Sequence, residues 1–274
     1  MSVGFVLLAH GRLARAAQLA DHVARAGFPV MVHLDRRTPP GETRRMRDNL
    51  AGLPVSWARR RYRCDWGMWG IVAATRDSAA DLLRARPDVR HVYLLSGSCL
   101  PLCPIRDLAD HLDRHRETDF IESAAPGPAA WSRGGDDAAR FRYFYPLPFR
   151  RRGAFDGLTA LQRRAGLARR PPSGVTPHLG VQWWCLTRRT LEAIHADPDR
   201  VALDAFFRWS WIPDESYFQT LARRHTRRLE ARSLTFAAFG GAIMCGTTAL
   251  VIWFREQRRA REARGDRPWP HGED

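Results

Sequence analysis

The sequence predicts an α/β fold, in which helices cover both faces of a mostly parallel central β-sheet. Three observations support this prediction. Short apolar runs of strand length alternate along the chain with amphipathic segments of helical periodicity, the order typical of β-α-β units. The chain of 274 residues is long enough for one large domain with a sizeable core. Its content of 45% apolar and 27% charged residues is ordinary for a globular protein.

The strands are predicted from the apolar runs. The first, "VGFVLLAH" at 3–10, has no basic residue before it and no small-residue cleavage site after it, so it is interpreted as a strand and not as a signal peptide. The other predicted strands follow the same logic and span 29–35, 54–57, 89–97, 119–123 and 180–187.

The helices are predicted from apolar positions at helical spacing and from their end signals. The segment 13–27 stops at Gly27, and the segment 104–115 starts with proline at a first helical turn. Further helices are predicted around 41–50 and at 68–87 and 188–196. The stretch 124–178, with many Gly, Pro and Arg residues, is predicted to be rich in loops.

The charge is unusual, because all 44 basic residues are arginine and the formal net charge is +15. Complete replacement of lysine indicates a codon bias as readily as a demand for guanidinium groups. The charge favours anionic partners such as phosphates or acidic lipid. The arginines are dispersed over several predicted helices and no nucleic-acid-binding motif is visible, so no nucleic acid partner is expected.

The five cysteines are scattered, odd in number and without paired metal-ligand spacing. A reduced compartment fits this pattern best, so a cytoplasmic location is expected. "CLPLC" at 99–103 resembles half a metal site, but no second Cys or His pair completes it.

Polar residues follow several of the predicted strands. Because ligands of parallel sheets bind at the carboxyl ends of the strands, these residues are candidates for a site. Asp35 is the sharpest candidate, since it follows a buried strand, precedes Arg36 and can accept hydrogen bonds from ribose hydroxyls or a base. It can equally be an aspartate that ends a strand at a turn, and His10 can equally be a structural hydrogen-bonding residue. The cluster consists of His10, Asp35, Ser96, Gly97 and Glu122.

"DWGMWG" at 65–70 combines glycines with tryptophans before a helix. It has two interpretations, a packing turn or a wall for a sugar or uracil ring. The second makes Trp66 and Gly67 candidate ligand contacts.

Two adjacent carboxylates, Asp214 and Glu215, follow Pro213 inside "WSWIPDESYFQTLARRH" at 209–225. Proline suits a helix start, so Glu215 is expected in the first turn, where the helix dipole and free amides favour the ionised form. Judged by its position alone, Glu215 is either a favourable charge at a helix end or a general base. The flanking aromatic residues favour the base.

Seven motifs in order resemble the core-2/I-branching β-1,6-N-acetylglucosaminyltransferase and peptide O-xylosyltransferase family. They are "LLAH", "VHLDRR", "RCDWGMWGIVAA", "YLLSGSCLPLCPI", "DFIE", "GVQWWCLTRRTLEAI" and "IPDESYFQTL". The resemblance covers roughly residues 3–225. It implies a GT-A-like nucleotide-sugar transferase fold and inverting transfer of N-acetylglucosamine or xylose from a UDP-sugar to a glycan or polysaccharide hydroxyl. It also implies that no divalent metal or other cofactor is required.

The resemblance assigns roles to individual residues. Glu215 falls on the catalytic base and Asp35 on the nucleotide contact, whereas Asp214 is expected to cap and orient the turn. The tryptophans near these motifs, including Trp209, are either sugar-stacking surfaces or core. The implied nucleotide-sugar contacts are His10, Asp35, Arg36, Trp66, Gly67, Ser96 and Gly97, and the implied acceptor or sugar contacts are Glu122, Gln182, Trp183, Trp184 and Asp214.

The leaving diphosphate needs cations. Metal-dependent GT-A enzymes use an Asp-x-Asp motif, but "DPD" at 197–199 follows a helix and is interpreted as a helix-stopping loop. The family supplies a basic pair after the "PDE" helix, and this sequence departs from that pattern. Arg227, Arg228 and Arg232 are the candidates to replace it. This departure keeps open a catalytically impaired sugar-nucleotide-binding or scaffold protein of the same fold, with a basic nucleic-acid-binding protein as a weaker alternative.

The sequence divides into a catalytic domain at 1–232, an apolar segment at 233–254 and an arginine-rich tail at 255–274. Leu234 to Phe254 carries no charge and is long enough to span a bilayer as a helix. A single span from the cytoplasm would place the arginine-rich tail outside, against the positive-inside tendency. Three interpretations therefore stay open: a membrane span, a segment lying against the membrane, and an altered end of the coding frame.

Overall fold

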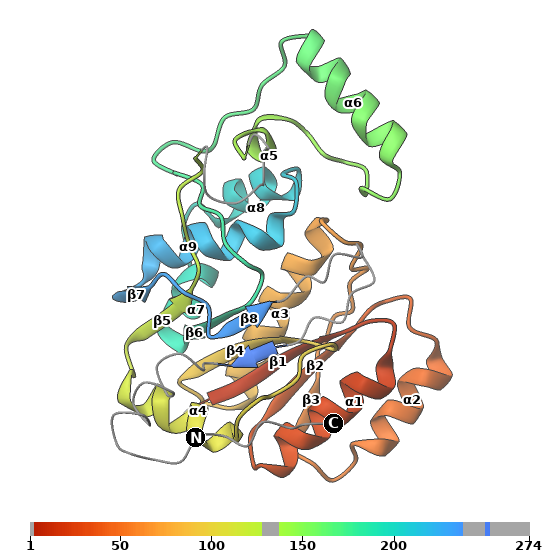
Figure 1. Ribbon diagram of the computed structural model, residues 1–274, viewed down its shortest axis with the longest axis vertical. Helices are drawn as coiled ribbons and strands as arrows, with labels where there is room; N and C mark the ends of the chain where they lie inside the picture. The colour runs from red at the N-terminus through yellow and green to blue at the C-terminus, as the bar shows by residue number, and fades with distance from the viewer. Residues whose placement is uncertain (1–2, 128–136, 238–249, 253–274) are drawn as a thin grey trace, which may run out of the picture.

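The computed structural model describes residues 3–127, 137–237 and 250–252 (Figure 1). Its centre is a seven-stranded sheet of order β3-β2-β1-β4-β6-β5-β7. Within this sheet the paired strands run parallel except for β6, which is antiparallel to both β4 and β5. The predicted mostly parallel sheet is thus confirmed. The strands are β1 (Val3–Ala9), β2 (Val30–Leu34), β3 (Val55–Trp57), β4 (His91–Ser96), β5 (Thr118–Ile121), β6 (Trp184–Thr187) and β7 (Arg228–Glu230).

Helices cover both faces of the sheet, as predicted, because alternate residues of the buried strands point to opposite sides. In β1, Phe5 and Leu7 face one apolar cluster, and Val6 and Leu8 face the other. The first cluster includes residues of α1 (Leu13–Arg25), α2 (Pro40–Asn49) and α4 (Ile105–Arg114). The second includes residues of α3 (Trp69–Ala85), α7 (Arg188–His195), α8 (Arg200–Arg208) and α9 (Tyr217–His225).

The stretch 124–178 contains more regular structure than its composition predicted. It forms the short helix α5 (Ala139–Arg142) and the longer helix α6 (Arg152–Arg164). Within α6 only Phe155 and Gln162, two turns apart, are buried, so its apolar signal is too sparse to stand out among Gly and Arg residues. Figure 1 shows α6 at the top of the view, on the far side of α5 and α8 from the sheet. α8 was not predicted either.

The sheet register brings the predicted strand-end residues to one edge. Ala9 pairs with Leu34, and Leu8 pairs with Ser96, so β1, β2 and β4 end side by side. The chain immediately beyond these strands stays hydrogen-bonded, since the Asp35 N–H donates to the Ala9 carbonyl at 3.0 Å. This edge is therefore where a ligand site is expected.

The apolar segment 233–254 begins inside the fold. Leu234 is buried in the cluster that contains Phe5, and the hydroxyls of Thr235 and Tyr93 lie 2.8 Å apart. β8 (Thr235–Ala237) pairs antiparallel with β9 (Leu250–Ile252). Within the described ranges, no helix is long and apolar enough to cross a membrane. The rest of the segment, 238–249 and 253–254, and the arginine-rich tail lie outside the described residues.

Candidate active site

Asp35 is buried at the end of β2, and its carboxylate accepts four hydrogen bonds from the protein itself. Oδ1 accepts from the Arg37 backbone N–H at 2.7 Å and from Nε of Arg37 at 2.9 Å. Oδ2 accepts from Nη2 of Arg37 and from the Cys64 N–H, each at 2.8 Å. Burial by itself would raise the pKa of Asp35, but these donors outweigh it and hold the pKa well below its usual range. Asp35 is thus an ionised carboxylate that ties the turn after β2 to the loop before α3.

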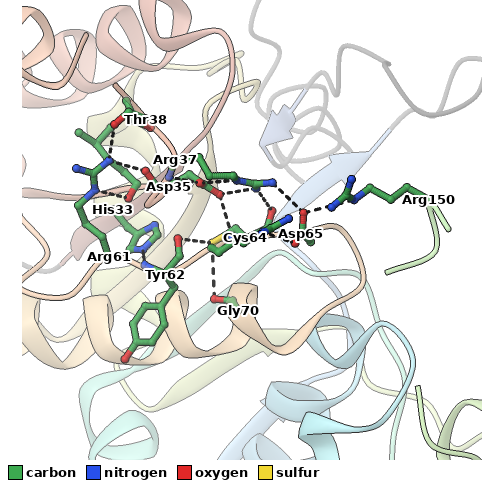
Figure 2. A network of polar contacts seen from close by, with 12 residues as sticks. His33, Asp35, Arg37, Thr38, Arg61, Tyr62, Cys64, Asp65, Gly70 and Arg150 are labelled. Atoms are coloured by element: carbon green, nitrogen blue, oxygen red, sulfur yellow. Dashed lines mark hydrogen bonds and ion pairs between the residues drawn. The ribbon is translucent and has the colours of Figure 1, made fainter. Parts of the chain in front are cut away.

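Arg37 extends this network toward the "DWG" loop. Its Nη1 donates to Asp65 at 2.8 Å, and Arg63 approaches the same carboxylate at 2.8 Å. Figure 2 shows Arg150 reaching Asp65 from the segment before α6, with an N–O distance of 3.9 Å. Ion pairs thus connect three segments: the end of β2, the loop before α3 and the segment before α6. Arg36 is exposed, and its backbone N–H donates to the Tyr62 carbonyl at 2.9 Å.

The remaining predicted donor-side residues lie along the same edge. His10 is exposed directly after β1. Ser96 is half-buried, and its N–H donates to the Cys99 sulfur at 3.1 Å. A side chain at Gly97 would place its Cβ 3.1 Å from that of Ala16, so glycine allows α1 to pack closely there. In the described ranges, no group of three His, Cys, Asp or Glu side chains is arranged to hold a metal ion.

The "PDE" residues form a short 3₁₀ turn, Pro213–Glu215, in which Pro213 comes first and Glu215 lies in the first turn, as predicted. This turn is separate from α9, which begins at Tyr217. Ser216, with φ −144° and ψ −33°, interrupts the helical backbone. Ile212, before the turn, has a left-handed φ of 51°. For a β-branched residue that conformation costs about 1–3 kcal/mol and persists only where its surroundings impose it.

Gly67 supplies part of that restraint. Its carbonyl accepts from the Ile212 N–H at 3.3 Å, and a Cβ on Gly67 would lie 3.4 Å from Cγ1 of Ile212. These contacts support the packing-turn interpretation of "DWGMWG" at Gly67, and the interpretation as a wall for a sugar or uracil ring stays a prediction. Trp66 in the same loop is 50% exposed, and its ring centre lies 5.7 Å from that of Phe149.

Glu215 accepts a hydrogen bond on Oε2 from Nη1 of Arg140 at 2.8 Å. The Glu215 side chain is 31% exposed, whereas that of Arg140 is only 11% exposed. Burial raises the pKa of Glu215, and Arg140 opposes this rise. Sequence reasoning missed Arg140, because it lies in the stretch predicted as loop and no motif distinguishes it from its arginine neighbours.

Asp214 is buried beside Glu215. Burial, with a further contribution from Glu215, raises the pKa of Asp214 to about 7. Asp214 lies inside the 3₁₀ turn, whose N-cap is Ile212, and Ser216 is the N-cap of α9, so Asp214 does not occupy a cap position. Its predicted orienting role stays a prediction. The turn is held by Pro213 and by the Glu215 N–H, which donates to the Ile212 carbonyl at 3.1 Å.

Glu122, predicted from the end of β5, lies close to Glu215. Burial raises the pKa of Glu122, and the charge of Glu215 raises it further. Gly180 joins the two segments, since its N–H donates to the Glu215 carbonyl at 2.9 Å. A Cβ on Gly180 would lie 1.8 Å from the Glu122 carbonyl oxygen, so only glycine fits. Gln182 is half-buried two residues further on.

Trp183 and Trp184 are core residues. Both are buried, one in each of the two apolar clusters on the opposite faces of the sheet. The interpretation that they stack on a sugar is therefore wrong, because neither offers a ring face to solvent. Trp209 is 39% exposed and keeps its two interpretations.

The register separates the three arginines predicted at the diphosphate. Arg228 lies opposite Thr118, at the start of β5, and Arg227 pairs with Glu117 at 2.9 Å. Both lie at the end of the sheet opposite Glu215, which argues against their predicted role. Arg232 follows the end of β7, with Nε 2.7 Å from Glu230, and so lies toward the correct edge.

"DPD" lies between α7 and α8, which confirms that it is a helix-stopping loop. Asp197 is buried, forms an ion pair with Arg224 at 3.0 Å and lies within hydrogen-bond distance of Nε2 of His225 at 2.7 Å. These contacts give the Asp197 carboxylate a structural role.

Comparison of the sequence with known proteins identifies the family. The sequence matches the Core-2/I-Branching enzyme family over residues 3–267, which extends beyond the resemblance seen in the motifs. It is 26% identical to xylosyltransferase 1 of Homo sapiens over 231 residues and 25% identical to xylosyltransferase 1 of Rattus norvegicus over 228 residues, 80% of this chain in each case. The chain spans 22% and 25% of the length of these two relatives. Because the family match covers nearly the whole chain and includes the Glu215 turn, the protein belongs to the Core-2/I-Branching enzyme family of glycosyltransferases.

Proposed function

We propose that this protein is an inverting glycosyltransferase that moves a sugar from a UDP-sugar to a hydroxyl group of a glycan or polysaccharide, without a divalent metal. N-acetylglucosamine and xylose are the proposed sugars, and the similarity to xylosyltransferase 1 supports the second. The proposed location is cytoplasmic, which suits the free thiols of Cys64, Cys99 and Cys185.

The observation that carries the proposal is the Glu215 turn. Glu215 is partly exposed, lies three residues after the strained Ile212 and has one oxygen fixed by Arg140. Such a carboxylate can act as the general base for one acceptor hydroxyl. The hydroxyl proton passes to Glu215 while the oxygen attacks the anomeric carbon from the face opposite UDP. The bond from that carbon to the phosphate oxygen breaks, and UDP leaves with the electron pair.

The donor is proposed to lie along the edge formed by β1, β2 and β4. Because four protein donors already occupy the Asp35 carboxylate, a ribose hydroxyl has to share or replace a bond that Arg37 now makes. Trp66 offers an exposed ring for the sugar or the uracil. Arg232 is the remaining predicted cation for the diphosphate.

The test replaces the proposed base. Glu215→Gln keeps the size of the side chain but cannot accept the proton, so turnover is expected to fall about 100-fold to 10,000-fold while UDP affinity changes only a few fold. Glu192→Gln, at an exposed glutamate on α7, is the matched control and should leave turnover unchanged. Each variant is assayed with UDP-N-acetylglucosamine and UDP-xylose, with and without a chelator, and the anomeric configuration of the product is read by NMR. Unchanged turnover in Glu215→Gln would remove this residue from the mechanism.

The departure from the family's basic pair supports a second candidate, a protein that binds a sugar nucleotide without transferring it. Binding of UDP with no turnover by the unaltered protein, across donors and acceptors, would identify that case.

A further inference from the structure

Arg140 is held in place from two sides. Its guanidinium lies over the Trp211 ring, 5.6 Å from the ring centre, and its carbonyl accepts from the Trp211 N–H at 3.0 Å. Trp211 directly precedes Ile212, the strained residue before the Glu215 turn. The arginine and the carboxylate that it contacts are thus fixed to the same short segment.

Only one oxygen of Glu215 is engaged by Arg140. Oε2 accepts from Nη1 at 2.8 Å, and within the described ranges no hydrogen bond to Oε1 is formed. A carboxylate with one fixed oxygen cannot rotate freely about its last bond. Its second oxygen is therefore presented in a defined direction.

We propose that Arg140 is the positioning residue of this site: it fixes Oε2 of Glu215 and so directs Oε1 to the acceptor hydroxyl. The charge of Arg140 also favours the ionised form of this carboxylate. This inference rests on the proposed function. It gives the stretch between β5 and β6 a part in catalysis, because α5 supplies Arg140. Since Arg140 touches neither the acceptor nor the donor in this scheme, it acts through Glu215.

The charges around Glu215 show why such a cation is needed. Asp214 precedes it on the same turn, Asp137 faces it from the residues before α5, and Glu122 faces it from the end of β5. Burial and Asp137 favour protonation of Glu215, and Arg140 opposes both. Glu215 in turn raises the pKa of Asp214 and of Glu122. Removal of Arg140 would raise the pKa of Glu215 further, and a protonated carboxyl group cannot take the proton of the acceptor hydroxyl.

The test compares Arg140→Gln and Arg140→Lys with Arg142→Gln, an exposed arginine on the same short helix. Removing an opposite charge at this distance raises the pKa of a carboxyl group by about one to three units. In Arg140→Gln, kcat should therefore fall about 10-fold to 1,000-fold at low pH, and the deficit should shrink as the pH rises. Arg140→Lys keeps the charge without the rigid fork, so its pH profile should match the unaltered protein while kcat falls about 10-fold. Arg142→Gln should change neither.

Carboxyl ¹³C NMR of the ligand-free protein provides a readout besides activity. The resonance of Glu215, assigned by its loss in Glu215→Gln, should titrate at higher pH in Arg140→Gln than in the unaltered chain. A loss of kcat that is equal at every pH, with an unmoved Glu215 titration, would overturn the inference. If Arg140→Gln fails to fold, Arg140→Lys decides, and unaltered kcat in that variant would overturn the positioning role.

The two proposals fail separately. If Glu215→Gln stays active, the proposed base is wrong and the role of Arg140 falls with it. If Glu215→Gln is inactive while the Arg140 variants behave like Arg142→Gln, the proposed function stands and only the inference about Arg140 is lost.

Discussion

A single methyl group at residue 180 tests how closely the site is built. In Gly180→Ala the new Cβ would lie 1.8 Å from the Glu122 carbonyl oxygen and 2.8 Å from Cγ of Gln219. Because real Cβ contacts stay beyond 3.0 Å, the end of β5 and the Gly180 backbone have to separate by about 1 Å. The backbone oxygen on one side cannot rotate away as a side chain would.

The displacement reaches the proposed base directly, since the Gly180 N–H donates to the Glu215 carbonyl. Overpacking of this kind costs about 1–3 kcal/mol of unfolding free energy. A misplacement of about 1 Å in a catalytic group costs about 100-fold in rate. We therefore expect Gly180→Ala to lose about 100-fold in kcat, with a donor KM that changes much less.

Urea unfolding and steady-state kinetics measure the two effects. The matched control is Gly157→Ala in α6, where the added Cβ meets nothing within 4 Å and a helical alanine is favoured by up to about 1 kcal/mol. If Gly180→Ala keeps the stability and kcat of the unaltered protein, the contact between β5 and the Glu215 turn does not position the base.

Two further predictions concern the donor edge and the diphosphate. Asp35→Asn removes the charge of a buried carboxylate and turns one of its two accepting oxygens into a donor, so UDP affinity and the free energy of unfolding should each fall by about 1.5–3 kcal/mol, measured by calorimetry and urea unfolding. Because the pKa of Asp35 is depressed in the fold, its ionised form stabilises the protein above its unfolded pKa near ~4, and this stability is lost as the pH falls below that value. This account would be contradicted if the free energy of unfolding of Asp35→Asn lay below that of the unaltered protein by the same amount at pH 7 and at pH 3. Arg232→Gln should raise the KM for the donor about 10-fold, because one charge-assisted contact to the diphosphate is lost. Arg228→Gln should leave this KM unchanged. Equal effects of the two substitutions on the KM would contradict the assignment from the sheet register.

The fold was largely predictable because its signals are local. β1 to β4 are apolar runs of strand length, and α1 and α3 carry helical periodicity over several turns. The prediction failed where burial is sparse, as in α6, whose two buried residues leave little pattern to detect.

The site was predictable only in part. Asp35, Glu122 and Glu215 lie at one edge, as the strand ends and the family motifs predicted. Arg140 was not predictable, because its contact with Glu215 joins residues 75 positions apart in a chain full of arginines. The left-handed backbone of Ile212 also has no sequence signature, since isoleucine is normally excluded from that conformation.

The direction of β6 has a consequence for how this enzyme can diversify. Because β6 runs antiparallel to β5, with Ile121 paired to Trp184, the chain between them leaves the sheet and returns to it at neighbouring positions. The bridge between Ala124 and Leu179 continues this pairing beyond the strands. The segment between β5 and β6 carries α5 and α6, which lie in the upper part of Figure 1. Because its two ends are paired with each other, this segment can change in length and sequence while the strand order stays intact. If the proposed function holds, replacement of this segment can give the enzyme new acceptors, while the strands assigned to the nucleotide stay the same.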